Sequence, residues 1–312
     1  MTKTKVAKKY GFITVTFCLV MLVAFAGTVF AQTGLTKVAD GVYSYVDSED
    51  PSPVHSFGAN AGIIIGRDGI VVVDTLISAK EAKRFIKDIR AVSDKPVKYA
   101  VNTHYHLDHT LGNSEFAKLG ATVIAHASTK ASLLENGNAL LGRAKYFGLS
   151  DDDMNGTIVV PPSLTFIDRM EIDLGDRKIE LINAGPSHTD GSIVVLVPDS
   201  KVLFAGDTLF TNYHPNMRDG DIQGWVKALD LIASMDVAGI IPGHGPLSTK
   251  KDVSDMKNYL IAFDAKVKEL LGRSGDPAYI ASEVKKALPA RHYFDMFIVS
   301  NIKAGYMKTN QK

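Results

Sequence analysis

The sequence predicts an α/β protein in which two β-sheets pack face to face, with helices on the outside. Short apolar runs bounded by Gly, Asp and Pro occur in both halves of the chain, as expected for the strands of a sheet. In each half, longer segments with apolar residues at helical spacing follow these runs. Sheets and amphipathic helices must bury their apolar faces, and two stacked sheets with outer helices achieve this for both halves.

The first half of the chain contains five expected strands and two expected helices. The strands are predicted at 41–46, 61–66, 70–74, 97–102 and 121–125. One helix is predicted over 78–91, because Ala82, Phe85 and Ile89 fall on one face, and another over 127–146.

The second half repeats this order. Strands are predicted at 164–167, 169–174, 177–182, 192–197, 202–205 and 240–241. Gly175-Asp176 is the expected hairpin turn between two of them. Helices are predicted over 222–235 and 250–271. The tail from 276 to 307 also has helical spacing, and we expect it to pack as two helices over the sandwich or to mediate homodimer contacts.

The first 31 residues have the pattern of a signal peptide. Four Lys residues precede an uncharged apolar run from Phe12 to Phe30, and Val29-Phe30-Ala31 fits cleavage before Gln32. An uncleaved anchor is the alternative, because this run approaches the roughly 20 residues that a spanning helix needs. We therefore expect an exported protein, periplasmic or secreted, without stable membrane insertion after cleavage. The predicted organisation is a signal peptide at 1–31, a catalytic domain at 32–272 and a helical extension at 273–312.

Composition excludes several functional classes. The chain has 35 Lys+Arg and 34 Asp+Glu, and without its Lys-rich first 31 residues the net charge is −3. A basic surface for nucleic acid is therefore not expected, and a small-molecule substrate is the expected partner. The single Cys, Cys18, lies within the apolar run. The mature chain thus lacks thiol nucleophiles, Cys metal ligands and disulfides.

Potential metal ligands are concentrated directly after the predicted strand at 97–102. The segment Thr103-His104-Tyr105-His106-Leu107-Asp108-His109 brings three imidazoles and a carboxylate to the carboxyl end of that strand, where sheet-based enzymes commonly hold ligands. His104 and His106 alternate with Tyr105 and are expected to point the same way, while Asp108 and His109 turn toward a second position. One short peptide is therefore able to supply two adjacent metals.

Three further residues follow predicted strands and stand among glycines. His188 lies in GPSHTDGS at 185–192, Asp207 in GDTLF at 206–210 and His244 in PGHGP at 242–246. Together with the histidine segment they make a set of imidazole and carboxylate ligands without sulfur. Such a set suits zinc and equally ferrous iron or manganese.

In these motifs and their order, the chain from about Val38 to Leu271 resembles the metallo-beta-lactamase-fold hydrolase superfamily. The resemblance implies a four-layer αββα sandwich of two mixed β-sheets flanked by helices, with the metal site at the edge between the sheets. It implies that a first metal is held by His104, His106 and His188, and a second by Asp108, His109 and His244. Asp207 would bridge both, and Asp74, at a strand end, would brace the histidine loop from the second shell.

The resemblance implies an exported hydrolase with two Zn²⁺ ions, although Fe or Mn would also suit the ligands. A hydroxide that bridges the metals would attack an ester, thioester, lactone or amide bond, the last including a beta-lactam. Asp108 is the expected catalytic residue, because it would orient the hydroxide and hand a proton to the leaving group. Asp207 stands where zinc beta-lactamases usually have Cys or Ser, and this pattern is that of the glyoxalase II-like and lactonase-like branches.

Three residues are candidates for the substrate pocket. His55 lies in the polar loop 47–58, where the family often places a substrate-covering loop, and an ordinary surface connection is the alternative. Tyr213 and His214 follow Asp207 closely and are candidates for binding a substrate carbonyl or carboxylate.

Two other functions compete with the hydrolase. The superfamily includes mononuclear iron persulfide dioxygenases, which share the histidine loop but use only three of the ligands. The complete ligand set, His244 included, favours two metals. A non-catalytic exported metal-binding protein is the other alternative, and Asp108 argues against it because a metal holder would not need this residue.

Overall fold

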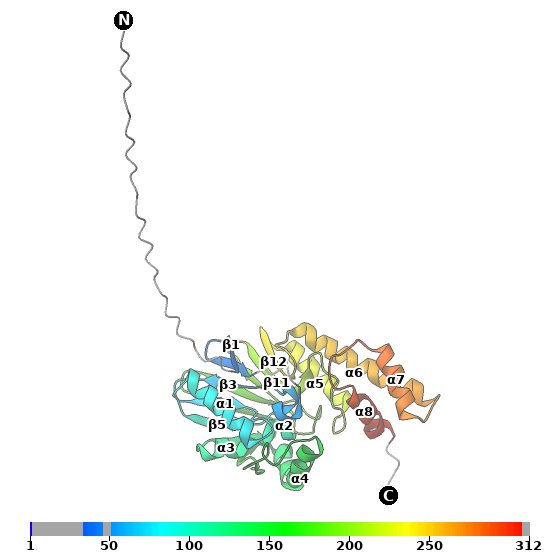
Figure 1. Cartoon of the computed structure of the whole chain (residues 1–312), viewed down its shortest axis with the longest axis horizontal. Helices are drawn as coiled ribbons and strands as arrows, with labels where there is room; N and C mark the ends of the chain where they lie inside the picture. Colours follow the sequence, from blue (N-terminus) through cyan, green and yellow to red (C-terminus); the bar gives the residue numbers. More distant parts are fainter. Residues whose placement is uncertain (2–33, 46–50, 308–312) are drawn as a thin grey trace. The chain divides into compact units, whose positions relative to one another are not determined.

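Two mixed β-sheets stacked face to face form the centre of the protein (Figure 1). The structure is a computed structural model that describes residues 1, 34–45 and 51–307. The predicted signal peptide, apart from Met1, and the predicted loop residues 47–50 lie outside the described residues.

Seven strands in the described part of the chain form the first sheet, in the order β1-β2-β3-β4-β5-β6-β7. They are β1 (Leu35–Ala39), β2 (Val42–Tyr45), β3 (Ala61–Ile65), β4 (Ile70–Val73), β5 (Val97–Val101), β6 (Thr122–His126) and β7 (Leu164–Phe166). Neighbours from β1 to β4 are antiparallel and those from β4 to β7 are parallel. The carboxyl ends of β4 and β5 therefore meet at one edge.

The second sheet has the order β12-β11-β10-β9-β8 among the described residues. Its strands are β8 (Arg169–Asp173), β9 (Lys178–Asn183), β10 (Ile193–Val197), β11 (Val202–Phe210) and β12 (Gly239–His244). Only the pair β11 and β12 is parallel in this sheet as described.

Side chains alternate between the two faces of each strand, which explains which residues lie between the sheets and which face the outer helices. In β10, Ile193 and Val195 pack between the sheets against Val71 and Val101, whereas Val194 points to the outer helices. The outer face of the first sheet packs on α1 (Ala79–Val92) and α3 (Asn113–Lys118). The outer face of the second packs on α5 (Ile222–Ser234) and α6 (Lys250–Leu271). The predicted αββα sandwich is therefore confirmed.

Three elements cover the edge where the predicted ligands lie. These are the short helix η1 (Pro53–Gly58), α2 (Leu107–Thr110) and α4 (Ala127–Tyr146), which share an apolar cluster that includes Phe57, Leu107 and Leu140. The predicted helix over 127–146 is thus observed as α4, which covers this edge of the sandwich.

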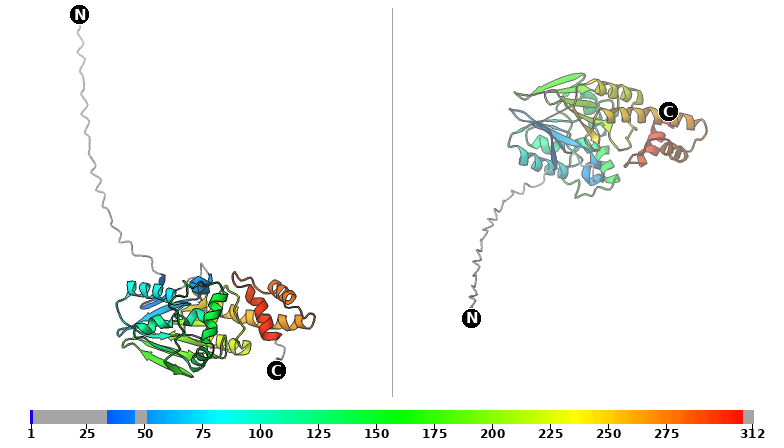
Figure 2. Two further views of the ribbon diagram at one scale, coloured as in Figure 1. Left: turned by 60° about the horizontal axis from the view of Figure 1, so that its bottom comes forward. Right: turned by 90° about the horizontal axis from the view of Figure 1, so that it is seen from above.

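The C-terminal segment forms α7 (Pro277–Ala287) and α8 (Met296–Tyr306). Together with α6 they lie at one end of the molecule, as two views show (Figures 1 and 2). Ile280, Val284, Ile298 and Ile302 belong to the same apolar cluster as α5 and α6. The tail thus packs on the outer layer of the sandwich. Across 34–45 and 51–307, none of the helices combines the length and apolarity that a membrane crossing requires.

Candidate metal centre

The histidine segment lies at the edge that β4 and β5 share. Asp74 follows β4, and the residues from Asn102 onward follow β5. Since the two strands are parallel neighbours, both chain ends arrive at the same place. His106 is the N-cap of α2, so Asp108 and His109 sit within a helical turn, and the His109 ring lies 4.4 Å from the ring of His104.

Asp74 is buried beneath this segment and receives three hydrogen bonds from it. The Thr103 backbone N–H donates to Oδ1 at 2.8 Å, and the Thr103 hydroxyl donates to Oδ2 at 2.8 Å. His109 donates from Nδ1 to Oδ2, also at 2.8 Å. Asp74 has a positive φ of 59°, a strained conformation that such contacts must hold in place. With Nδ1 of His109 engaged in this way, Nε2 is left to face the metal centre.

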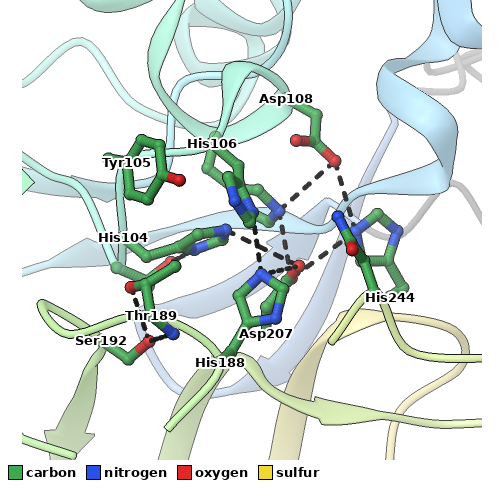
Figure 3. A network of polar contacts seen from close by, with 12 residues as sticks. His104, Tyr105, His106, Asp108, His188, Thr189, Ser192, Asp207 and His244 are labelled. Carbon is green, nitrogen blue, oxygen red and sulfur yellow. Dashed lines mark hydrogen bonds and ion pairs between the residues drawn. The ribbon is translucent and has the colours of Figure 1, made fainter. Parts of the chain in front are cut away.

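His104, His106 and His188 form the first ligand cluster with one oxygen of Asp207 (Figure 3). Nε2 of His188 lies 2.8 Å from Nδ1 of His106 and 3.2 Å from Oδ2 of Asp207. Nε2 of His104 lies 3.6 Å from the same oxygen. Four donor atoms from three separate segments thus converge on one point.

Asp108, His109 and His244 form the second cluster. Nε2 of His244 lies 3.3 Å from Oδ2 of Asp108, and Nε2 of His109 lies 3.7 Å from that oxygen. Oδ1 of Asp207 lies 3.1 Å from Nε2 of His109 and 3.5 Å from Nε2 of His244. One oxygen of Asp207 therefore faces each cluster, which is the arrangement of a bridging carboxylate.

The donor atoms are buried, and several have no hydrogen-bond partner among the described residues, as expected of metal ligands. All seven side chains are buried, with at most 7% of any residue exposed. Nε2 of His104, Nε2 of His109 and Oδ1 of Asp207 are buried and have no hydrogen-bond partner among the described residues. Unpaired buried polar atoms are costly, and all three point into the clusters. The two clusters fit a dinuclear metal site.

The pKa values of these groups follow from burial and mutual charge. Burial alone would raise the pKa of Asp207, but the surrounding imidazoles hold it well below its usual range. Burial lowers the pKa of His104 and of His188. For His244 the carboxylates of Asp207 and Asp108 outweigh burial and raise the pKa to about 9. Divalent cations bind imidazoles in their unprotonated form, so a metal at the second cluster would displace the proton that His244 holds at neutral pH.

Glycine at position 243 allows the second sheet to approach Asp207. A Cβ atom there would stand 2.0 Å from Oδ1 of Asp207 and 2.6 Å from its backbone nitrogen. Any larger residue would therefore displace the carboxylate that faces both clusters. This explains the glycine in the PGHGP motif in physical terms.

A cavity of about 300 Å³ opens beside the clusters. His106, Asp108, Asp207 and His244 form its floor. Its walls come from η1, the end of α4, the loop 211–221 and the start of α8, through Phe57, Arg143, Tyr146, Phe147, Asn216, Arg218, Phe294, Met296, Phe297 and Ser300. The C-terminal segment thus completes the wall next to the metal centre.

The structure does not bring the three predicted pocket residues to this cavity. His55 is half-buried with Nδ1 3.4 Å from the Ser52 hydroxyl, and its neighbour Phe57 lines the cavity instead. Tyr213 is buried against Tyr293 and Phe294. His214 turns toward α6, where Nδ1 lies 2.8 Å from the Tyr259 hydroxyl. The described cavity lining includes none of the three.

Asp219 is a site residue that no sequence motif singles out. Its Oδ2 accepts a hydrogen bond from Nε2 of His106 at 3.1 Å, and it also bonds the Tyr105 hydroxyl. These partners hold the pKa of Asp219 well below its usual range despite burial. The available signal was an acidic residue in the loop before α5, which is weak because such loops are often polar.

Comparisons with known proteins agree with this geometry. Residues 56–244 match the family model of the metallo-beta-lactamase superfamily. A linear primary-alkylsulfatase of Pseudomonas sp. is 28% identical over 224 residues, which cover 61% of this chain but only 42% of that protein. An acyl-coenzyme A thioesterase of Homo sapiens is 27% identical over 215 residues, 60% of this chain and 72% of the relative.

A solved structure has the same fold. The metallo-beta-lactamase from Pontibacter korlensis superposes with a TM-score of 0.61 at 21% identity, over 74% of this chain and 99% of that one. The family match spans the stretch from η1 to His244, which holds both ligand clusters. This chain belongs to the metallo-beta-lactamase superfamily.

Proposed function

We propose that this protein is an exported hydrolase with two zinc ions that cleaves an ester, thioester, lactone or amide bond in a small molecule. The observation that carries the proposal is the position of Asp207, with one oxygen toward each ligand cluster. Relatives named as an alkylsulfatase and an acyl-coenzyme A thioesterase belong to hydrolase classes and support the reaction type.

The donor set supports zinc, with iron or manganese as the other ions that it suits. Five imidazoles and two carboxylates without sulfur make up the two clusters. Two bound divalent cations would polarise the scissile bond and lower the pKa of water, which supplies a nucleophile at neutral pH. The chain therefore needs no Ser or Cys nucleophile.

Asp108 is the proposed catalytic residue. It lines the cavity, and its Oδ2 lies 3.3 Å from Nε2 of His244. Facing imidazoles hold the pKa of Asp108 below its usual value against the effect of burial. An ionised carboxylate at the cavity floor is able to orient the attacking water, accept its proton and pass that proton to the leaving group.

The test begins with metal content. Mature protein purified from the exported fraction, without chelators or added metal, should contain close to two zinc ions per chain by elemental mass spectrometry. It should hydrolyse members of a panel of aryl esters, thioesters, lactones and beta-lactams. Combined replacement of His104 and His106 by Ala should abolish turnover while circular dichroism shows a retained fold.

Three results would overturn the proposal. About one iron per chain with persulfide oxidation would assign the protein to the dioxygenase alternative. Tight metal binding without turnover of any panel member would assign it to metal holding. Full activity in the doubly substituted protein would place the chemistry elsewhere.

A further inference from the structure

We propose that the cavity selects substrates with an apolar body and a separate anionic group, which Arg143 and Arg218 bind. This inference rests on the proposed hydrolase function and adds the substrate class. The anionic group, a carboxylate or sulfonate, is distinct from the bond that is cleaved.

Two guanidinium groups line the cavity beside the metal centre. Arg143 stands in the last turn of α4 and Arg218 in the loop before α5. Nε of Arg218 lies 4.0 Å from Oδ1 of Asp219, whose Oδ2 accepts a hydrogen bond from Nε2 of His106. Arg218 therefore lies close to the first ligand cluster.

These cations are poorly neutralised by the protein itself. No described carboxylate forms an ion pair with Arg143, which is half-buried. Nε of Arg218 lies 4.0 Å from Oδ1 of Asp219, at the limit of an ion pair, while Oδ2 of Asp219 is bonded to His106. Asp108 and Asp207 direct their oxygens at imidazoles of the clusters. A guanidinium is suited to bind a planar or tetrahedral oxyanion through paired hydrogen bonds.

The other side chains in the described cavity wall are mainly aromatic. The Phe294 ring lies 5.9 Å from the ring of His244 and 6.4 Å from that of Phe57. Phe147 and Phe297 extend this wall, at 5.0 Å from Phe57 and 5.1 Å from Phe294 respectively. These rings therefore favour an aryl or alkyl body.

Residues of both ligand clusters line the same cavity as the arginines and the aromatic rings. A substrate whose apolar part contacts Phe294 and whose anion reaches Arg143 and Arg218 would place an intervening ester or amide over Asp108. The volume of about 300 Å³ suits a molecule of the size of a substituted aryl ester. The arrangement explains why cations and aromatic rings share one small cavity.

Binding is tested with 4-phenylbutanoate and its neutral amide by titration calorimetry on the metal-loaded protein. The wild type should bind the anion at least about tenfold more tightly than the amide, since charged hydrogen bonds are involved. The variants Arg143→Met and Arg218→Met should each lose most of this preference and bind the amide unchanged. Arg169→Met is the matched control, because Arg169 is exposed on β8 and pairs with Glu180.

The double variant Arg143→Met/Arg218→Met tests whether the arginines or the metals cause the preference for the anion over the amide. It should have unchanged metal content and bind both probes equally. A preference that persists in the double variant, or its absence in the wild type, would overturn the inference.

Turnover distinguishes failure of this inference from failure of the proposed function. The metal-loaded wild type should hydrolyse O-phenylacetylglycolate, whose ester separates the aryl ring from the carboxylate, with a kcat/KM about tenfold above that for the corresponding neutral glycolamide ester, mainly through KM. Equal kcat/KM values would overturn the inference and leave the hydrolase intact. If the protein hydrolyses neither these esters nor any member of the wider panel, the hydrolase function is overturned. The calorimetric preference for the anion would then be the only test of the anion site.

Discussion

The carboxylate of Asp219 lies 3.1 Å from Nε2 of His106, on the far side of the ring from the metal centre. This contact determines which ring nitrogen carries the proton. Nε2 donates to Asp219, and Nδ1 is left as the acceptor that faces Nε2 of His188 at 2.8 Å. A loop far along the chain thus orients a residue of the first ligand cluster.

Replacing Asp219 by Ala should weaken metal binding at the first cluster. Loss of such an outer partner typically costs about 10–100-fold in metal affinity, because the ligand ring is no longer held in one tautomer and orientation. Competition with a chromophoric chelator measures the affinity. Asp236→Ala is the control, since Asp236 is exposed and pairs with Lys201. An affinity equal to that of the wild type would contradict this role.

Asp207 and Asp108 should differ in how many metals their loss removes. Asp207 faces both clusters, so Asp207→Asn should reduce the bound metal to less than one equivalent per chain. Asp108 faces only the second cluster, so Asp108→Asn should retain about one equivalent. Elemental analysis after gel filtration distinguishes the two. Identical stoichiometries would refute the bridging position of Asp207.

The close approach at Gly243 predicts a strong effect of one methyl group. In Gly243→Ala the new Cβ would stand 2.0 Å from Oδ1 of Asp207, so the carboxylate must move. We expect loss of metal from the second cluster and a fall in activity of about 100-fold or more, because misplacement by about 1 Å has such effects. Gly275→Ala is the control, since a Cβ there meets nothing within 4 Å. Normal metal content in Gly243→Ala would disprove this argument.

Asn301 of α8 ties the loop that carries Asp219 to the outer layer. Its side chain donates to the Pro215 carbonyl and accepts from the Met217 backbone N–H, both at 2.8 Å. Asn301→Ala would leave two backbone groups without these partners, at a cost of about 1–3 kcal/mol for each group that stays buried.

Denaturant unfolding should show this loss as a lower midpoint. The loosened loop should also raise KM, because Arg218 lies within it. Asn258→Ala, an exposed position on α6, should have neither effect. Unchanged stability of Asn301→Ala would mean that α8 does not hold the loop.

His214 should make stability depend on pH. Burial lowers the pKa of His214 to about 4, although the neighbouring Asp295 opposes this. An unfolded imidazole titrates near 6.5, so between about pH 4 and 6.5 the unfolded chain binds more protons. The contribution of His214 to the free energy of unfolding is therefore complete above pH 6.5 and declines as the pH falls toward 4.

The variant His214→Gln isolates this contribution. Tyr259, Asp295, Arg291 and Lys285 surround or influence the residue and are unchanged in it. Denaturant midpoints measured from pH 7.5 to 4.5 should fall less steeply for the variant than for the wild type. Parallel profiles would show that His214 does not titrate as the structure indicates.

Much of the fold was accessible from the sequence because its signals are local. Short apolar runs bounded by Gly, Asp and Pro located most strands of both sheets, and helical spacing located α1, α5 and α6. The first strand, β1, was not predicted, and β11 continues to Phe210 rather than ending at 205. The last five residues of β11 are the ligand motif at 206–210, whose glycine and polar residues interrupt the apolar pattern of a strand. The polar ends of buried strands are therefore read as loops.

The candidate ligands were accessible for a related reason. His104, His106, Asp108 and His109 stand in one peptide whose spacing is informative by itself. The pocket residues were not predictable in this way, because residues close to Asp207 in sequence need not lie close to it in space. After β11 the chain turns, and His214 ends against Tyr259 of α6.

By itself the sequence determined the sandwich and the superfamily and predicted the set of candidate ligands, because apolar runs, helical spacing and contiguous motifs are local signals. Only the tertiary structure decided how Asp207 divides its oxygens and that Asp219 orients His106. It also decided that α4 supplies the cavity wall with Arg143 and that the segment before α8 supplies Phe294. These relationships join residues far apart along the chain. They arise from how layers pack, and packing leaves no periodic signal in any one segment.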